Sequence, residues 1–506
     1  MTASAARPVS RRGLLSTLVS FGAAAGAATA AMAGPPKRRR VDADPSGLLM
    51  RLVARTNFGV TEVELARAES LGYEGYLEYQ LNFAAISDSA IEDRIATSIP
   101  FLAQNPVAYY TQNNGVLQNQ LTEATILRAV YSQRGLFQRM VEFWTDHFNI
   151  DARIGPLGIL KVNDDRNVIR THAMGNFRDL LIASAHSPAM LSYLDNDIST
   201  ALSPNENYAR EIMELHTMGA DGGYTQTDVE EVAKCFTGWG RYALNAAAGA
   251  NAGLFRYTPN SHRAGTKTIF AGTPQQLNIP ARNIIDGQQD ADDVINALVA
   301  HPSTARYIAK KLTQWFLGET APQQTIDEVA AEYTRTNGDI RSMIRVALHP
   351  ANLATSPLKY KRPFHMYVSA LRALPTTITT TSTLRSTLAE AGHQPFTWGP
   401  PDGFPDFMAY WTGLVISRWN FGARLLLLNG ANPGINGVSI NVPAFFAGLT
   451  GASAMVEKIN RTMFGGEMAS HEYLRLTTYL GLNPTNSTSQ RETIGLAIGA
   501  PSFQWY

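Results

Sequence analysis

The sequence predicts a mainly α-helical protein: one large multi-helix domain with long loops and one small β-hairpin. Three observations support this fold class. Apolar residues recur at helical intervals in most of the long segments. The breaks between these segments carry glycines, prolines and capping residues, as at Gly219. Alternation of apolar and polar residues with a period of two, which favours strands, is found at residues 255–272.

The N-terminal region has the features of an export signal. The run SRRGLL at residues 10–15 is a twin-arginine signal pattern. A weakly apolar stretch rich in Ala and Gly follows and ends in Ala-Met-Ala at residues 31–33, which fits a signal-peptidase site. We therefore expect a twin-arginine signal peptide at residues 1–33, a basic flexible segment at 34–47 and a single large helical domain at 48–506. The protein would be periplasmic or extracellular, with no stable membrane span after cleavage. An uncleaved tether is the alternative.

The composition narrows the classes of partner. The chain of 506 residues carries 43 Lys and Arg against 42 Asp and Glu, which gives a formal net charge of +1. A balance this close to neutral argues against nucleic acid or an anionic membrane as the main partner. Cys235 is the single cysteine, so no intramolecular disulfide is expected. We interpret Cys235 as a small buried apolar residue on a helix.

The individual elements follow from local patterns. Helices are predicted, in order, at residues 48–59, 61–72, 73–83, 118–150, 163–185, 205–218, a segment starting at 227, 290–300, 303–317, 325–336, 339–348, 364–374, 410–428 and 444–464. The hairpin is expected at residues 255–272, with its turn at 263–265 and with His262 and Lys267 as surface residues. Residues 375–386 are expected to form a surface linker. Residues 394–409 are rich in proline, glycine and aromatic residues, which indicates a packed loop beside a cleft.

The densest group of functional side chains lies on the predicted helix at residues 205–218. At about 100° per residue, Glu211 and Glu214 share one stripe with Arg210 beside them, whereas His216 points to the apolar side. Paired carboxylates beside an arginine can act as acid and base or bind a metal. They can also form ordinary ion pairs on a solvated helix face. The spacing leaves these alternatives open.

A second polar stripe lies on the segment at residues 136–148. Arg139, Glu142 and Asp146 share one face, and His147 lies at its edge. A single histidine on an aromatic-rich helix is most often a hydrogen-bonded core residue. His147 stays a candidate because the helix at 205–218 could bring its carboxylates opposite it.

Several motifs together resemble a bacterial family known as domain of unknown function 1800. They are, in order, RTNFG at 55–59, FWTDHF at 143–148, NENYAREIMELHTMG at 205–219, GGYTQTDV at 222–229, TGW at 237–239, His262 and Lys267, HP at 301–302, AKKL at 309–312, KRP at 361–363, PPDG at 400–403 and APSF at 500–503. The matches keep their order over nearly the whole mature chain, which makes the resemblance specific.

The resemblance implies an exported protein but names no reaction. Members are similar in often carrying twin-arginine signals, and their genes often neighbour those of a sulfatase-like exported family. That implies a sulfatase-like exported protein as a partner. The chain departs from the pattern at Thr145, where some members have histidine. If the family site were a histidine-rich metal centre, this chain would lack one ligand.

Two functional hypotheses follow. In the first, the protein is an enzyme of the cell envelope, with His147, Glu211 and Glu214 binding a divalent metal or acting as acid and base. Arg210 would orient an anionic group, and the loop at 400–405 would wall the cleft. In the second, the protein is a non-catalytic envelope scaffold whose polar stripes are buried ion-pair networks. The first predicts a shared accessible pocket, and the second predicts full pairing with arginines.

Overall fold

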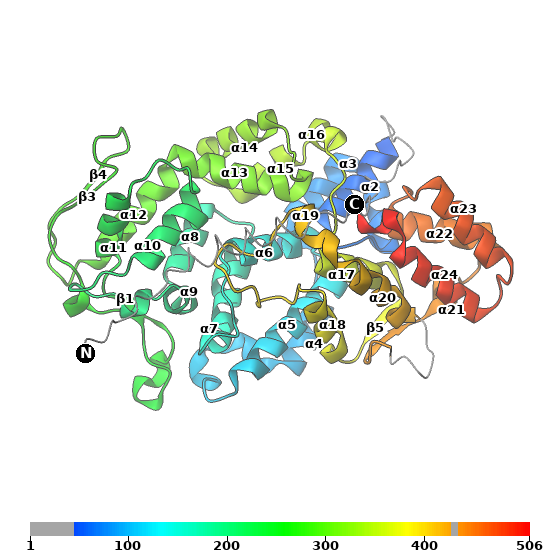
Figure 1. Ribbon diagram of the computed structural model, residues 1–506, viewed down its shortest axis with the longest axis horizontal. Coiled ribbons are helices and arrows are strands. Elements are labelled where there is room, and N and C mark those ends of the chain that lie inside the picture. The colour runs from blue at the N-terminus through cyan, green and yellow to red at the C-terminus, as the bar shows by residue number, and fades with distance from the viewer. Residues whose placement is uncertain (1–44, 427–433) are drawn as a thin grey trace, which may run out of the picture.

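Helices make up most of the computed structural model, which describes residues 45–426 and 434–506. Within these residues, β structure is limited to three two-stranded antiparallel sheets (Figure 1). The mainly α prediction is therefore confirmed. The predicted signal peptide and residues 34–44 of the basic segment lie outside the described residues. Residues 45–47, the last three of the predicted basic segment, belong to the first described helix.

The first third of the chain forms helices that surround α6 near the middle of the molecule (Figure 1). The segment predicted as one helix at 118–150 is two helices, α5 and α6, because the chain bends at residues 132–134. The elements are α2 (Pro45–Thr56), α3 (Glu62–Leu81), η1 (Phe83–Ala85), α4 (Ser89–Ser98), η2 (Pro100–Ala103), η3 (Pro106–Ala108), α5 (Asn114–Tyr131), α6 (Gly135–His147), α7 (Leu157–Asp164), the π-helix η4 (Asp165–Arg170), α8 (Phe177–Ala185) and α9 (Pro188–Tyr193).

The middle third carries the central helix and two of the small sheets. The elements are η5 (Asn196–Ile198), α10 (Glu206–Met213), the π-helix η6 (Glu214–Met218), α11 (Gln226–Cys235), β1 (Trp239–Arg241), η7 (Ala246–Asn251), β2 (Phe255–Tyr257), η8 (Pro259–Ser261), β3 (Lys267–Ile269), β4 (Leu277–Ile279), α12 (Gln288–Ala300), α13 (Pro302–Leu317), α14 (Gln323–Thr336), α15 (Ile340–Ala347) and α16 (Pro350–Thr355).

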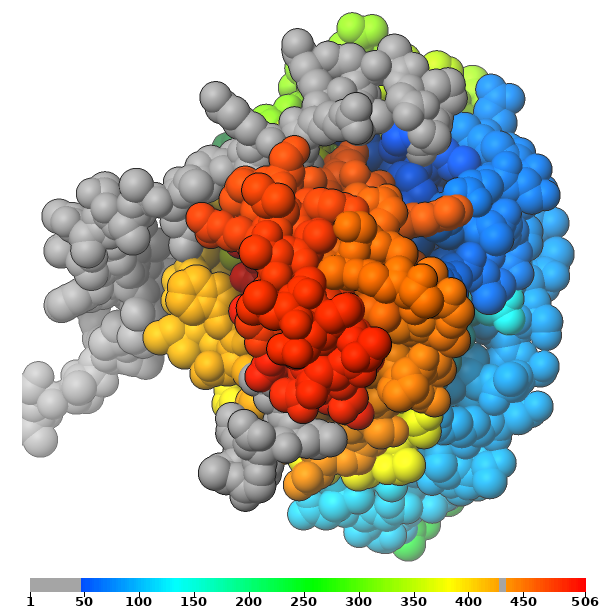
Figure 2. Space-filling view, turned by 90° about the vertical axis from the view of Figure 1, so that its right-hand side faces the viewer, coloured from blue at the N-terminus to red at the C-terminus, as the bar shows by residue number. Residues whose placement is uncertain are grey.

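The last third begins with a buried helix and ends in a helical group at one end of the molecule. Figure 2 shows this end, with the C-terminal helices in orange and red beside N-terminal residues in blue. The elements are α17 (Pro363–Ala373), β5 (Thr376–Ile378), α18 (Ser382–Glu390), α19 (Met408–Trp411), η9 (Thr412–Leu414), α20 (Val415–Leu426), β6 (Val438–Ile440), α21 (Val442–Phe445), α22 (Ala452–Phe464), α23 (Ser470–Gly481), α24 (Ser487–Gly499) and η10 (Pro501–Gln504).

The helices predicted at 163–185 and 444–464 are each interrupted, before α8 and between α21 and α22. The predicted hairpin and linker also differ from the structure. The hairpin at 255–272 is wrong: β2 pairs with β1, and β3 pairs with β4. The 3-10 turn η8 separates the two strands and sends them into different sheets. The linker at 375–386 is also wrong, because β5 pairs with β6 and α18 starts at Ser382. The first error arises because each strand pairs with a partner outside residues 255–272, and the second because β5 pairs with a strand about sixty residues away.

The apolar interior consists mainly of two large clusters that share helices. One cluster is drawn from residues 49–353, and the other combines residues 58–162 with 364–503. Helix α7 contributes Leu157 and Leu160 to the first cluster and Ile159 and Val162 to the second. Opposite faces of one helix therefore join the two clusters. None of the described helices is both long and apolar enough to cross a membrane.

Candidate functional site

The central helix changes its winding where its acidic residues lie. Asn205 caps the start of α10 by accepting a hydrogen bond from the backbone N–H of Asn207 at 2.9 Å. The helix continues as a π-helix from Glu214 and ends at Gly219, whose φ of 80° favours glycine. The predicted helix is confirmed in extent, but its last turn is wider than an α-helix. Short π-helical turns of this kind occur frequently at functional sites.

The next helix begins two residues earlier than predicted. Thr225 is the N-cap of α11, with a capping box formed with Asp228. The prediction had placed that motif at residues 227–230. This start directs Tyr224 back to the preceding helix, where its hydroxyl donates a hydrogen bond to Glu214 Oε2 at 3.0 Å. Glu214 is therefore held by a tyrosine rather than by an arginine.

Arg210 does not pair with the two carboxylates predicted to be its companions. Its guanidinium donates to Glu206 Oε2 at 3.2 Å and to Gln226 Oε1 at 2.8 Å. It thus connects α10 to the start of α11. Arg210, predicted to orient an anionic group, therefore links two helices in the structure.

Glu211 is the unusual member of the group. It is partly buried, and its carboxylate makes no hydrogen bond or ion pair with any described residue. Burial raises the pKa of the Glu211 carboxyl to about 7, and the negative charge of Glu214 adds to this rise. Arg210 opposes the rise, and Asp402 on a distant loop reinforces it. A carboxyl with this pKa can both accept and release a proton near neutral pH.

His147, at the end of α6, is buried among aromatic rings. Its Nε2–H donates to the backbone carbonyl of His216 at 3.1 Å, which links α6 to η6. Its Nδ1 is buried without a partner among the described residues. Burial, with the nearby charge of Lys311, holds the pKa of His147 well below its usual range. His147 is therefore a neutral imidazole that faces the central helix.

The acidic side chains on α6 form ion pairs with two arginines. Arg362 donates to Asp146 Oδ2 at 2.6 Å and to Glu142 Oε1 at 2.5 Å, and its side chain is only 4 % exposed. Arg139 holds the other Glu142 oxygen at 2.6 Å. Burial still raises the pKa of the Asp146 carboxyl to about 6, although Arg362 opposes that rise. This stripe matches the ion-pair network that the scaffold hypothesis predicts.

A pocket of about 280 Å³ opens beside the end of α6. Its lining includes His147 and Asp146 from α6 and Lys311 from α13. The loop before α19 provides another wall and crosses the middle of the molecule (Figure 1). Gly403 in this loop has a φ of 78°, and a Cβ there would lie 2.7 Å from the Asp146 carbonyl carbon. The loop thus packs directly against the helix, as the predicted cleft wall requires.

The structure brings only some of the predicted site residues together. His147 lines the pocket, whereas Glu211 and Glu214 are not among its lining residues. In the part of the chain that is described, no group of three or more His, Cys, Asp or Glu side chains is placed to hold a metal ion. The described structure therefore does not gather His147, Glu211 and Glu214 into one such group, and metal binding by this set stays a prediction.

Three polar residues near this pocket escaped the sequence reasoning. Lys311 and Tyr307 lie one turn apart on α13, with the amine 5.6 Å from the centre of the tyrosine ring. Asp402 lies on the loop and affects the pKa values of Glu211, Tyr307 and Lys311 through its charge. The adjacent lysines at 310–311 could have pointed to this site from the sequence. Only one of two adjacent helical residues can face solvent fully, and here Lys310 is exposed whereas Lys311 lies on the partly buried side of α13.

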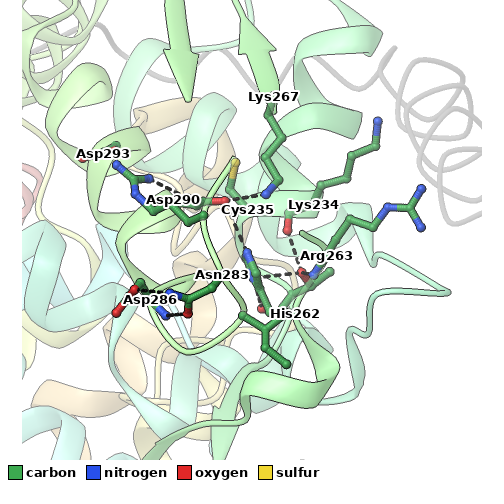
Figure 3. A network of polar contacts seen from close by, with 12 residues as sticks. Lys234, Cys235, His262, Arg263, Lys267, Asn283, Asp286, Asp290 and Asp293 are labelled. Carbon is green, nitrogen blue, oxygen red and sulfur yellow. Dashed lines mark hydrogen bonds and ion pairs between the residues drawn. The ribbon is translucent and has the colours of Figure 1, made fainter. Parts of the chain in front are cut away.

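His262 and Lys267 belong to a buried network and not to a surface turn. Both are 3 % exposed, which corrects the expectation from the sequence. Figure 3 shows both side chains directed at Asp290 on α12. Asp290 pairs with the Lys267 amine, with His262 Nε2 at 3.3 Å and with Arg282 at 2.6 Å, which together hold its pKa at about 2 although burial acts the other way. These contacts fasten the sheet region to α12, and Cys235 lies buried beside them, as expected.

Comparisons with known proteins identify a family and no closer relative of known activity. The family model described as "Protein of unknown function (DUF1800)" matches residues 51–505. No curated protein matches the chain. No solved structure matches it either. The match covers nearly the whole chain and every residue of the site described above, so the chain belongs to the DUF1800 family.

Proposed function

We propose that the protein is an exported enzyme whose acid–base chemistry is performed by Glu211, which does not line the pocket beside the end of α6 but is coupled to it through the charge of Asp402. Glu211 is the proton-transferring carboxylate, and Glu214 and Asp402 are the charges that tune it. The observation that carries this proposal is Glu211 itself: a partly buried carboxylate without a partner among the described residues and with a pKa near 7. An unpaired, partly buried carboxylate is rarely present because it stabilises a fold. Carboxyl groups with strongly shifted pKa values cluster at functional sites.

Replacement of Glu211 with glutamine is expected to stabilise the protein by about 1–2 kcal/mol at pH 8. The pKa of this carboxyl is about 7 in the folded protein and 4.5 ordinarily, so the folded state binds the proton more tightly. Its favourable contribution is complete below pH 4.5 and is lost as the pH rises through 7. Chemical denaturation at pH 5 and pH 8 measures the effect, which should be larger at pH 8.

Glu206→Gln is the matched control, because Glu206 lies on the same helix and is paired with Arg210 and Gln226. Its replacement should lower stability slightly, by less than about 1 kcal/mol. If Glu211→Gln also lowers stability at pH 8, the carboxylate holds the fold together and the acid–base role is wrong.

The catalytic claim is tested by incubating cell-envelope extracts with the purified protein. Mass spectrometry should reveal at least one component that changes mass with the wild-type protein. The same component should stay unchanged with the Glu211→Gln variant. Because that variant folds at least as stably as the wild type, loss of the change reports chemistry rather than unfolding. A change that both proteins produce equally would remove Glu211 from the reaction.

Export is part of the proposal and is supported by the sequence at residues 10–15. Replacement of Arg11 and Arg12 together by lysine should abolish transport, because the paired guanidinium groups define the signal. Cell fractionation and immunoblotting would then find the variant in the cytoplasm and the wild type in the periplasm or medium. Replacement of Arg38 and Arg39 by lysine, beyond the expected cleavage site, is the matched control and should leave transport unchanged.

The second candidate function is an envelope scaffold that assists a sulfatase-like exported protein. The observation that favours it is the α6 stripe, where Arg362 and Arg139 satisfy both Glu142 and Asp146. The unpaired Glu211 and the pocket lined by Lys311 favour the enzyme. Co-purification of a sulfatase-like protein with both wild type and Glu211→Gln, without any mass change in the extracts, would support the scaffold.

A further inference from the structure

Lys311 is partly buried, and it differs from several fully buried lysines of the chain. Lys161 pairs with Asp164 at 2.6 Å, Lys359 pairs with Asp406 at 2.5 Å, and Lys267 pairs with Asp290. Lys311 makes no hydrogen bond or ion pair with any described residue, and its amine lies 5.6 Å from the centre of the Tyr307 ring. Burying an amine without a counter-charge costs stability, so an unpaired lysine in this position needs another explanation.

The surroundings of Lys311 favour its neutral form. The amine lines the pocket together with the rings of Phe143, Trp315 and Phe407. Burial lowers the pKa of the Lys311 amine to about 8, although the carboxylates of the pocket oppose this change. The positive charge of Lys311 in turn lowers the pKa values of two buried imidazoles, those of His147 and His216. About a tenth of the amine is therefore unprotonated and nucleophilic at pH 7, far more than for a lysine with the ordinary pKa.

We propose that Lys311 is a nucleophile that forms an imine with the carbonyl group of a small aldehyde or ketone. The Nζ lone pair attacks the carbonyl carbon, and a proton moves from nitrogen to the new hydroxyl group. The hydroxyl then leaves as water while the C=N bond forms. One amine and one carbonyl compound thus give one imine and one water, and no oxidant or reductant is consumed.

Asp402 can carry the proton between nitrogen and oxygen. It lies on the loop wall of the same pocket, and its Oδ1 accepts a hydrogen bond from Trp398 Nε1 at 2.8 Å. Its Oδ2 has no hydrogen-bond partner among the described residues and is left to exchange the proton. His147 and His216 stay neutral beside the amine, so they do not compete as cations. A carboxylate beside a neutral amine is an established arrangement for imine chemistry.

The pocket fits a neutral carbonyl compound better than an anion. Four carboxylates line it, those of Asp146, Glu319, Asp402 and Asp406, and both Asp146 and Asp406 already hold a cation. Added negative charge from an anionic ligand would be repelled. The aromatic rings of the lining instead suit an apolar group attached to the carbonyl. This inference deepens the proposed function and rests on it for the view that the protein is an enzyme, but it does not depend on the titration of Glu211.

The test is reductive trapping with benzaldehyde, a neutral aromatic aldehyde, on the full mature protein. Sodium cyanoborohydride reduces the imine to a stable amine, and peptide mass mapping locates it. We expect one dominant adduct at Lys311 that saturates with benzaldehyde concentration and reaches half its maximal rate near pH 8. Lys310, the exposed neighbour, should react at least about tenfold more slowly, because it does not line the pocket that would hold the aldehyde.

Two variants make the outcome decisive. Lys310→Met should keep the adduct, whereas Lys311→Arg should lose it while preserving positive charge and the fold, as checked by thermal denaturation. Equal labelling of Lys310 and Lys311, or no adduct at Lys311, would overturn the proposal. Two competitors test the preference for a neutral ligand: inorganic phosphate, an anion, and benzyl alcohol, which is neutral. Stronger suppression of labelling by phosphate than by benzyl alcohol would also overturn the proposal. Glu211→Gln should keep the adduct, so failure of the Glu211 proposal and failure of this one are seen separately.

Discussion

Replacement of Arg362 with methionine is expected to lower the free energy of unfolding by about 3–5 kcal/mol at pH 8. Arg362 holds both Asp146 and Glu142, and all three side chains are less than 20 % exposed. Methionine fills a similar volume, but it leaves two carboxylates close together with only Arg139 beside them. A charge buried without its partner costs more than the net value of the pair. Urea denaturation followed by circular dichroism measures the loss.

The pH dependence separates this explanation from simple loss of packing. The pKa of Asp146 is about 6 with Arg362 in place, above the ordinary 3.8, so its contribution to stability is complete below pH 3.8 and is lost as the pH rises through 6. Arg362 opposes that rise, so the variant should shift the pKa further upward. The cost of the substitution should therefore be clearly smaller at pH 5 than at pH 8. An equal cost at both values would mean that packing, and not charge, is lost.

Two further variants complete the comparison. Arg345→Met removes an exposed pair with Glu78, whose side chains are 48 % and 54 % exposed, and should cost less than about 1 kcal/mol. Adding Asp146→Asn to Arg362→Met should restore part of the lost stability, because the unpaired charge is removed together with its partner. If the double variant is no more stable than the single one, Asp146 is not the charge that Arg362 compensates.

Local patterns gave much of the fold, because most of its elements are helices defined by their own residues. The capping residues and Gly219 bounded the central helix nearly correctly. The errors lie where distant segments decide the structure. Strands β2 and β3 have partners on either side of the expected hairpin, and the partner of β5 is about sixty residues away along the chain. Periodicity carries no information about such pairing.

The candidate site was predictable only in part, for the same physical reason. The stripe of Arg139, Glu142 and Asp146 follows from helix geometry, and the structure bears it out. The residue that satisfies this stripe, Arg362, lies more than two hundred positions away and follows no local rule. Helix geometry also predicted that Arg210 would lie beside Glu211, whereas in the structure Arg210 donates a hydrogen bond to Gln226 at the start of the next helix. Burial, which sets the pKa values of Glu211 and Lys311, is a property of the whole fold.

Gly403→Ala is the second substitution expected to have a large effect, with a loss of about 2–4 kcal/mol in the free energy of unfolding. The φ of Gly403 is 78°, which is costly for alanine, and the added Cβ would overlap the backbone carbonyl of Asp146. Backbone atoms at the end of α6 cannot turn aside as a flexible side chain could. The loop must therefore lift from the helix, and with it Asp402 must move away from Lys311.

Gly399→Ala in the same loop isolates this cause. Its φ is not positive, and a Cβ there would lie 3.9 Å from Asp151 and 4.0 Å from Arg153, which is ordinary contact. Thermal denaturation should show little change for Gly399→Ala and a clear fall for Gly403→Ala. Benzaldehyde trapping at Lys311 should slow in Gly403→Ala alone, because the loop carboxylate no longer faces the amine. Unchanged trapping in a destabilised Gly403→Ala protein would mean that the loop supports the fold without serving the pocket.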